Sequence, residues 1–194
     1  MKLSTLEDAI SDAAGLLLSR RPELIRRAQS IATLKAAGRR IRIHGDYHLG
    51  QVLYTGKDFT IIDFEGNLAR PLSERRIKRS PLQDVAGMLD SFYHASHSVL
   101  FGETPGVVPK PEQYTALEAW AKFWYRRVHT GFLSAYLETR GVAELLPGDG
   151  AQLGALLRLF LLDHALRKLQ HELTHAPARI LVPAHAVLEL LDTP

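Results

Sequence analysis

The stretch HGDYHLGQVLYTGKDFTIIDFEG, residues 44–66, constrains the fold more than any other part of this chain. It contains two short runs of apolar, β-prone residues, separated by the turn-forming residues 56–58. This order predicts a β-hairpin with a polar loop before it and an acidic turn after it. Because burying an unpaired charge is costly, the acids indicate either a solvated hairpin or an arranged site.

Helical spacing of apolar residues predicts helices on both sides of the hairpin. Their predicted starts are Ser4, Pro22, Ser80-Pro81, about Glu112 and Pro183. The chain is predicted to break at Pro147, before a helix that carries Leu153 and Leu169. Gly38 is predicted to end the second helix, RIRIH (residues 40–44) alternates as a strand does, and residues 66–79 are predicted to form a long loop. One apolar stripe of the long helix is predicted to face the core: Leu117, Trp120, Trp124, Val128 and Phe132. The sequence therefore predicts a mainly α domain with a small β-hairpin.

Composition excludes several classes of protein. A chain of 194 residues that is 46% hydrophobic and 23% charged is typical of a folded globular protein. It has no cysteine, which excludes disulfides, thiolate catalysis and cysteine-based zinc sites. The first residues lack the apolar core of a signal peptide, and no apolar run approaches a membrane span. We therefore expect a cytoplasmic protein with no membrane partner.

The basic charge of the chain does not by itself indicate nucleic-acid binding. The formal net charge is only +3, and the one dense basic stretch is ERRIKRSP, residues 74–81. No recognisable DNA- or RNA-binding motif accompanies that stretch. We expect no nucleic-acid partner, and we interpret the stretch as a solvated loop or as a contact to phosphate groups.

The polar groups at the base of the predicted hairpin suit phosphoryl transfer. That reaction needs a carboxylate at the acceptor hydroxyl and oxygen ligands that hold Mg²⁺ on a nucleoside triphosphate. Asp46 fits the first role, and Gln51 and Asp63 fit the second, with Glu65 as a further candidate. The same order of loop, hairpin and acid occurs in protein kinases, which carry H-R-D-L-x-x-x-N and then D-F-G.

Histidines allow other interpretations of the chain. His48 could contact substrate or metal, but a structural hydrogen bond within the loop is the preferred interpretation. His164, His171 and His175 lie near one face of a predicted helix without a carboxylate at metal-site spacing, so a packed or solvated face is preferred. GDYH matches part of the G-D-x-H motif of binuclear metallophosphatases, but no Asp-x-His precedes residue 44, and this class is rejected.

Three motifs together resemble the maltokinases, which are bacterial sugar kinases with the aminoglycoside-phosphotransferase fold, sometimes fused to trehalose synthase. The motifs are RIHGDYHLGQVL, IDFEG and RPLSERRIKRSPLQDVAGML. The commoner form of the first motif in that fold is H-G-D-x-H-x-x-N. Tyr47 after the aspartate and Gln51 in place of the asparagine are similar to the maltokinase branch. The resemblance is strongest over residues 42–89 and continues more loosely to residue 183.

The resemblance implies a reaction and its cofactors. The implied reaction is the ATP-dependent phosphorylation of maltose at its anomeric hydroxyl, with ATP and Mg²⁺ as cofactors. Asp46 carries over as the catalytic base. Gln51, Asp63 and Glu65 carry over as magnesium ligands.

The resemblance also implies supporting roles around the loop. His44 and Asp84 are expected to support the catalytic loop, and Asp84 is expected to accept hydrogen bonds from the loop backbone. His48, Arg75 and Arg76 are candidate contacts to the substrate or to phosphate.

The domain organisation implied by the resemblance is one lobe of a bilobal kinase. Residues 1–194 are expected to be the C-terminal lobe of a protein-kinase-like fold, with a catalytic loop at 44–51, a metal-binding turn at 63–66 and a helical subdomain at 81–194. The N-terminal lobe, which carries the phosphate-covering loop and the ATP-pairing lysine, is expected to be absent, because HGD begins at residue 44. We expect the isolated chain to be inactive, with that lobe or a fused trehalose synthase domain as its partner.

One departure leaves the substrate open. The family has a Tyr-Glu-x-x-Tyr-Glu-like pattern late in the chain, where this sequence has RKLQHE, residues 167–172, and only Glu172 matches. Another small-molecule kinase of the aminoglycoside-phosphotransferase fold is therefore an alternative. A non-catalytic module for sugar binding or assembly is a second one.

Overall fold

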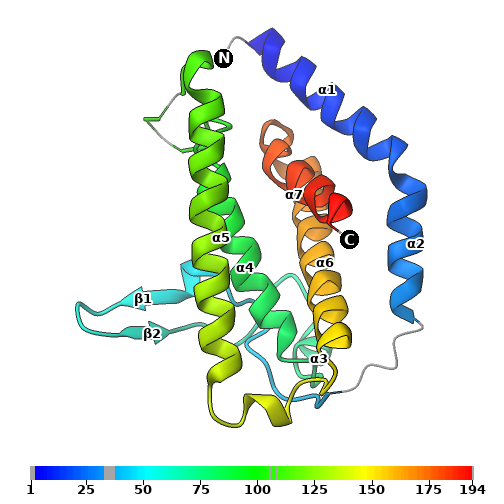
Figure 1. Ribbon diagram of the computed structural model, residues 1–194, viewed down its shortest axis with the longest axis vertical. Helices are drawn as coiled ribbons and strands as arrows, with labels where there is room; N and C mark the ends of the chain where they lie inside the picture. Colours follow the sequence, from blue (N-terminus) through cyan, green and yellow to red (C-terminus); the bar gives the residue numbers. More distant parts are fainter. Residues whose placement is uncertain (1–2, 33–37, 105, 108, 194) are drawn as a thin grey trace.

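The computed structural model describes residues 3–32, 38–104, 106–107 and 109–193, and shows a helical body from which a small antiparallel sheet projects (Figure 1). The helices and strands are α1 (Leu3–Ser19), α2 (Arg21–Ala32), β1 (Val52–Tyr54), β2 (Phe59–Ile61), α3 (Leu72–Arg75), α4 (Leu82–His97), α5 (Tyr114–Glu138), α6 (Gly150–His175) and α7 (Leu181–Asp192). Single 3₁₀ turns are η1 (Leu49–Gln51), η2 (Pro111–Gln113), η3 (Val142–Glu144) and η4 (Pro177–Arg179). The mainly α prediction with a small hairpin is confirmed.

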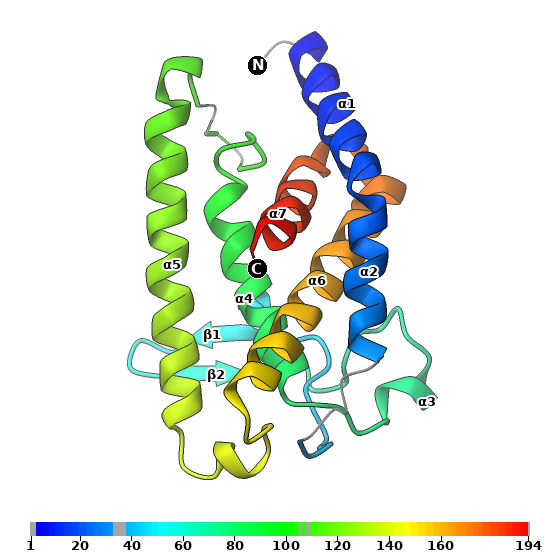
Figure 2. The same ribbon diagram turned by 45° about the vertical axis from the view of Figure 1, so that its right-hand side comes forward.

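Helix α4 is the central element of the body, between α5 and α6 (Figures 1 and 2). Its apolar positions recur at helical spacing, and Leu82 and Leu89 are completely buried. Burial of a leucine side chain stabilises a fold by about 1.5–3 kcal/mol. The main core cluster consists of Val85, Ala86, Met88, Leu89, Phe92, Leu157 and Leu161. The loop that contains Tyr47 packs on this same helix, so the core fixes the position of that loop.

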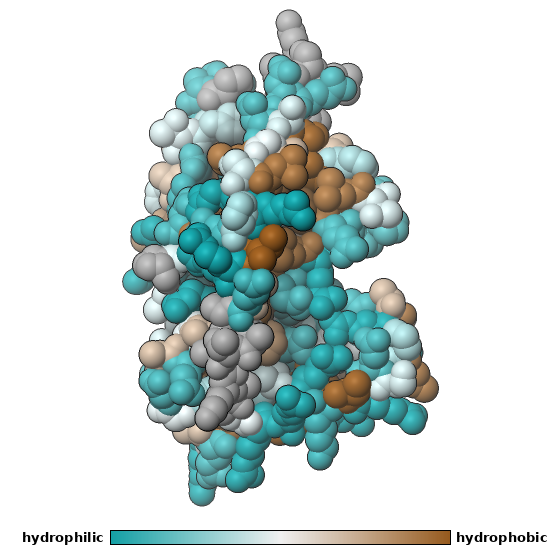
Figure 3. All heavy atoms as spheres, turned by 90° about the vertical axis from the view of Figure 1, so that its right-hand side faces the viewer, coloured by the Kyte–Doolittle hydropathy of each residue, from teal (hydrophilic) through white to brown (hydrophobic). Residues whose placement is uncertain are grey.

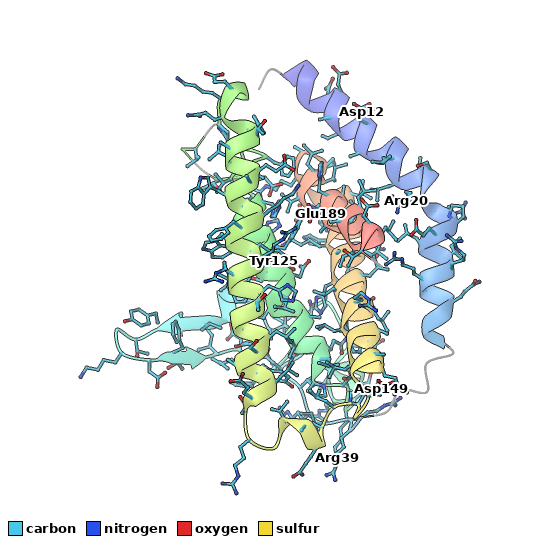
Figure 4. The ribbon with its side chains drawn as sticks, viewed as in Figure 1. Asp12, Arg20, Arg39, Tyr125, Asp149 and Glu189 are labelled. Carbon is cyan, nitrogen blue, oxygen red and sulfur yellow. The ribbon has the colours of Figure 1, made fainter. Side chains whose placement is uncertain are left out.

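Helix α2 and the turn before it brace the end of α7. The guanidinium of Arg27 donates hydrogen bonds to the backbone carbonyl oxygens of Leu190, Leu191 and Thr193 at 2.6–2.9 Å. The carbonyls at a helix C-terminus have no partner within the helix, so this contact satisfies them. Arg20, labelled in Figure 4, pairs with Asp192 at 2.8 Å. The face that carries α1 and α2 is largely hydrophilic, with its main apolar area in the upper half and a smaller one below (Figure 3).

The predicted core stripe of α5 is only partly correct. Val128 and Phe132 pack against the main cluster, but Trp120 and Trp124 are 67% and 43% exposed. Helix α5 lies at the edge of the body and is covered on one side, so an apolar stripe wider than that side reaches solvent. The prediction that both tryptophans belong to the core is therefore wrong.

Several predicted boundaries also differ from the structure. RIRIH forms one isolated bridge, between Ile41 and Arg79, because no further strand lies beside it within the described residues. The predicted loop 66–79 contains the short helix α3. Pro183 lies inside the first turn of α7, where a missing backbone N–H is tolerated. The predicted continuation of the second helix toward Gly38 falls on residues 33–37, which lie outside the described residues.

Within the part of the chain that the structure describes, no helix is both long enough and apolar enough to cross a membrane.

Candidate active site

The loop that contains Asp46 is anchored on the first turn of α4. The carboxylate of Asp84 accepts hydrogen bonds from the backbone N–H of His44 at 2.6 Å and of Gly45 at 2.9 Å. Burial raises the pKa of the Asp84 carboxyl, and the two backbone hydrogen bonds act in the opposite direction. A hydrogen bond to a charged group contributes about 1.5–3 kcal/mol, so this pair holds the loop firmly against the helix.

His44 joins the loop to the far end of the hairpin. Its ring is buried, and Nε2 lies 2.7 Å from the carbonyl oxygen of Ile62. A carbonyl oxygen can only accept, so Nε2 carries the proton and donates. The ring also contacts that of Phe64, with centroids 4.9 Å apart. His44 therefore fixes the separation between the loop that contains Asp46 and the acidic turn.

Two glycines let these segments approach each other closely. Gly45 and Gly66 have φ angles of +82° and +74°, which glycine adopts without strain. A Cβ at position 66 would lie 3.3 Å from the carbonyl oxygen of His44. Arg75 braces the same turn, because its Nη1 donates to the carbonyl oxygen of Glu65 at 3.1 Å. Part of the Arg75 guanidinium is thus used in the turn that follows the hairpin.

The closest approach in the site is between the loop and α4 at Gly87. A Cβ at this position would lie 2.7 Å from the carbonyl oxygen of Tyr47, which is too close for any real side chain. Gly87→Ala is expected to destabilise the chain by about 1–3 kcal/mol, because the loop must move away from the helix. Urea unfolding of the 194-residue chain measures the change.

Gly131→Ala is the matched control, because nothing lies within 4 Å of a Cβ at that position in α5. Alanine has the higher helix propensity, so this variant is expected to gain about 0.5–1 kcal/mol. Equal stability of the two variants would contradict the close packing of the loop on α4.

Asp46 has two differently placed carboxylate oxygens. Oδ1 accepts a hydrogen bond from Nδ2 of Asn67 at 3.1 Å. Oδ2 lies 3.9 Å from Nε2 of His48, which is longer than a hydrogen bond. The other ring nitrogen of His48, Nδ1, accepts from the backbone N–H of Gly50 at 3.1 Å and so caps η1. His48 thus makes a hydrogen bond within the loop while its second nitrogen faces Asp46.

The structure brings Gln51 and Asp63 to the same end of the hairpin. Val52 pairs with Ile61 in the sheet, and the backbone N–H of Ile62 donates to the carbonyl oxygen of Gln51 at 3.0 Å. Asp63 follows directly, with an exposed side chain and a φ of 60°. A positive φ is unusual outside glycine, and such residues concentrate at functional sites. The roles of both residues as metal ligands stay predictions.

The end of the hairpin carries one carboxylate, that of Asp63, and one amide, that of Gln51. Among the described residues, no group of three or more His, Cys, Asp or Glu side chains converges on one point. Mg²⁺ is commonly held by one or two carboxylates, phosphate oxygens and water. The carboxylate of Asp63 and the amide oxygen of Gln51 could supply the protein part of that set.

Glu65 and Arg76 have exposed side chains, and their roles as metal ligand and as substrate or phosphate contact stay predictions. A cavity of about 510 Å³ lies between α4, α5, α6 and α7, where Tyr125 and Glu189 are found (Figure 4). None of the predicted site residues lines that cavity.

Asn67 contacts Asp46, although nothing in the sequence indicates that it belongs to the site. It directly follows the DFEG motif, but no periodicity or spacing marks it. Its contact with Asp46 depends on two turns that pack against each other, and this arrangement is visible only in three dimensions.

Comparisons with known proteins identify sugar kinases as similar proteins. No protein-family model matches the chain. A glucosamine kinase of Streptacidiphilus jiangxiensis is 29% identical over 151 residues, which are 78% of this chain and 32% of that protein. A glucosamine kinase of Mycolicibacterium smegmatis is 35% identical over 154 residues, which are 77% of this chain and 34% of that protein. The chain thus spans about a third of the length of these relatives.

Solved structures agree on the fold. A glucosamine kinase crystal structure aligns with 97% of this chain and 44% of its own, with a TM-score of 0.71 and 24% identity. A second structure, of a glucosamine kinase in complex with glucosamine, ADP and inorganic phosphate, aligns with 96% of this chain and 45% of its own, with a TM-score of 0.69 and 25% identity. The chain therefore has the fold of one part of a glucosamine kinase. The relatives found are sugar kinases, as the motif resemblance implied, but they act on glucosamine by name and are not maltokinases.

Proposed function

We propose that this chain is the catalytic half of an ATP-dependent sugar kinase, and that its acceptor is glucosamine or a closely related hexosamine. The observation that carries the proposal is the arrangement around Asp46. Asn67 holds one carboxylate oxygen, the other oxygen makes no hydrogen bond within the described residues, and the hairpin end with Gln51 and Asp63 follows the same loop. This arrangement belongs to a fold shared with a glucosamine kinase that binds glucosamine, ADP and inorganic phosphate.

The proposed mechanism assigns one task to each part of the site. Oδ2 of Asp46 accepts the proton of the sugar hydroxyl, whose oxygen forms a bond to the γ-phosphorus of ATP as the bond to the β–γ bridging oxygen breaks. ADP leaves with the electrons of the broken bond. Gln51 and Asp63 would hold Mg²⁺, which neutralises charge on the phosphate oxygens. Asp84 and His44 keep the loop in place.

The proposal includes a further lobe that covers the nucleotide. Apolar and aromatic side chains of the hairpin are exposed: Leu53 at 51%, Tyr54 at 67%, Phe59 at 66% and Ile61 at 40%. Exposed apolar patches of this kind mark surfaces that pack against other protein. The greater length of the relatives agrees with such a lobe. Activity is therefore tested with this chain joined to the N-terminal lobe of a glucosamine kinase.

The acceptor is tested with a panel of glucosamine, N-acetylglucosamine, glucose and maltose under saturating Mg·ATP. We expect kcat/KM to be at least about 10-fold higher for glucosamine than for the other three, since a hydrogen bond to its charged ammonium group is worth about 1.5–3 kcal/mol. A preference for maltose would contradict the hexosamine acceptor and would support a maltokinase. Transfer to none of the sugars, in a folded protein that binds ATP, would contradict the kinase proposal and favour a non-catalytic sugar-binding module.

A further inference from the structure

We infer that Asn67 is a positioning residue, which fixes the carboxylate of Asp46 so that one oxygen remains available to the acceptor hydroxyl. This inference rests on the proposed function and adds a residue to it. Asn67 lies one residue past the DFEG turn, and its side chain is the only one that hydrogen-bonds the Asp46 carboxylate within the described part of the chain.

The orientation of the Asn67 amide follows from its second contact. Its Oδ1 accepts a hydrogen bond from the backbone N–H of Ala69 at 2.9 Å. A backbone N–H can only donate, so the amide oxygen must face it and the NH₂ group must face Asp46. Asn67 thus presents a donor to the carboxylate, in the orientation that a charged acceptor requires.

The two oxygens of Asp46 are consequently in different situations. Oδ1 is held at 3.1 Å by Asn67, whereas Oδ2 lies 3.9 Å from His48. The last side-chain torsion of aspartate is broad and weakly restrained by itself. A fixed hydrogen bond to Oδ1 limits that rotation and directs Oδ2 toward one place, which favours attack because the reacting atoms must be aligned closely.

The turn that carries Asn67 is itself braced. Gly66 is buried with φ +74°, and a Cβ there would lie 3.3 Å from the carbonyl oxygen of His44. Arg75 holds the preceding carbonyl, that of Glu65, at 3.1 Å. Asn67 is therefore placed by the packing of two turns and does not depend on Asp46 for its own position.

Kinetics of Asn67 variants, measured in the protein joined to an N-terminal lobe, test the positioning role. Asn67→Ala is expected to lower kcat by about 10- to 100-fold, with KM for the sugar and for ATP changed less than about 3-fold. Asn67→Asp places a second carboxylate beside Asp46, and two neighbouring carboxylates resist simultaneous ionisation. The acid limb of its pH–kcat profile should therefore move to higher pH. Ser73→Ala, on the exposed surface of α3, is the matched control and should leave kcat unchanged.

A direct measurement of the contact does not require activity. Asn67 is the only asparagine in the sequence, so selective ¹⁵N-asparagine labelling of the 194-residue chain gives one side-chain NH₂ pair. Acid titration should move that pair in the wild type and in Asp12→Ala, a control on the exposed surface of α1 (Figure 4). In Asp46→Ala the movement should be lost.

The two experiments separate the inference from the proposed function. Suppose that the wild type transfers phosphate, that Asn67→Ala keeps normal kcat and that Asn67→Asp keeps the wild-type pH–kcat profile. The positioning role is then wrong and the kinase proposal stands. If the wild type transfers none, the kinase proposal fails and the titration still decides the contact. If the Asn67 NH₂ pair of Asp46→Ala moved with acid as it does in the wild type, the inference would be overturned in either case.

Discussion

Replacing Asp46 by asparagine is expected to lower kcat for phosphoryl transfer by about 10²- to 10⁴-fold, the usual contribution of a general base. The variant keeps the size of the side chain and one carbonyl oxygen but loses the charged, basic oxygen at Oδ2. The acceptor hydroxyl is then neither oriented nor deprotonated. The KM for ATP should change little, because the proposed contact of Asp46 is to the acceptor hydroxyl and not to the nucleotide. Steady-state kinetics with the sugar and ATP varied separately measure both constants.

His48→Gln is the matched control for this variant. The ring of His48 caps η1 through the backbone N–H of Gly50 and lies beyond hydrogen-bond distance of Asp46. We therefore expect His48→Gln to lower kcat less than Asp46→Asn does. Normal turnover in Asp46→Asn together with complete loss in His48→Gln would refute the assignment of the catalytic base.

The second large effect is expected at Asp63, where replacement by asparagine removes a negative charge from the proposed magnesium site. Activity should fall, and the magnesium concentration for half-maximal activity should rise by about 10-fold or more, since even outer partners of metal ligands typically change metal affinity 10- to 100-fold. Titration of the initial rate with Mg²⁺ at fixed ATP measures the shift.

Glu65→Gln is the comparison for Asp63→Asn, because both lie on the same turn and both side chains are exposed. Glu65 lies further along the chain than Asp63 from the hairpin end that Gln51 and Asp63 share, so we expect a smaller shift in the magnesium requirement. An unchanged requirement in Asp63→Asn, or a larger shift in Glu65→Gln, would contradict the assignment of Asp63 as the principal metal ligand.

The sequence was sufficient for the elements whose pattern is local. Alternation and turn residues predicted the hairpin, and helical spacing predicted α4, α5 and α6, because these patterns reflect which side of each element is buried. The width of the buried side of a helix depends on how many neighbouring elements cover it. Trp120 and Trp124 follow the apolar spacing of α5, yet they reach solvent, since the helix is covered on one side only.

The site was predictable to a similar degree. The order of loop, hairpin and acid predicted that Asp46, Gln51 and Asp63 form one site. The register of the sheet places Gln51 and Asp63 at the same end of the hairpin, and the roles of all three residues stay predictions. Asn67 and Gly87 were not predictable, since their roles depend on how closely two turns approach each other and α4. The distances between two turns, or between a loop and a helix, cannot be predicted from sequence periodicity or spacing.

The sequence motifs also do not determine which sugar is the acceptor. The motifs around the loop and the DFEG turn serve phosphoryl transfer itself, so they are compatible with more than one sugar kinase. The departure from the maltokinase pattern at residues 167–172 left the sugar open. The similarity to glucosamine kinases, at 29% and 35% identity, now favours a hexosamine.

The most direct test of the central claim follows the transferred phosphoryl group by ³¹P NMR. The chain joined to a glucosamine kinase N-terminal lobe is incubated with Mg·ATP and glucosamine, beside the same protein carrying Asp46→Asn. The account predicts a new sugar-phosphate resonance that grows as the γ-phosphate signal of ATP declines, and at least about 100-fold slower growth in the variant. Equal rates in the two proteins, or no sugar phosphate from the wild-type protein while it remains folded and binds ATP, would contradict it.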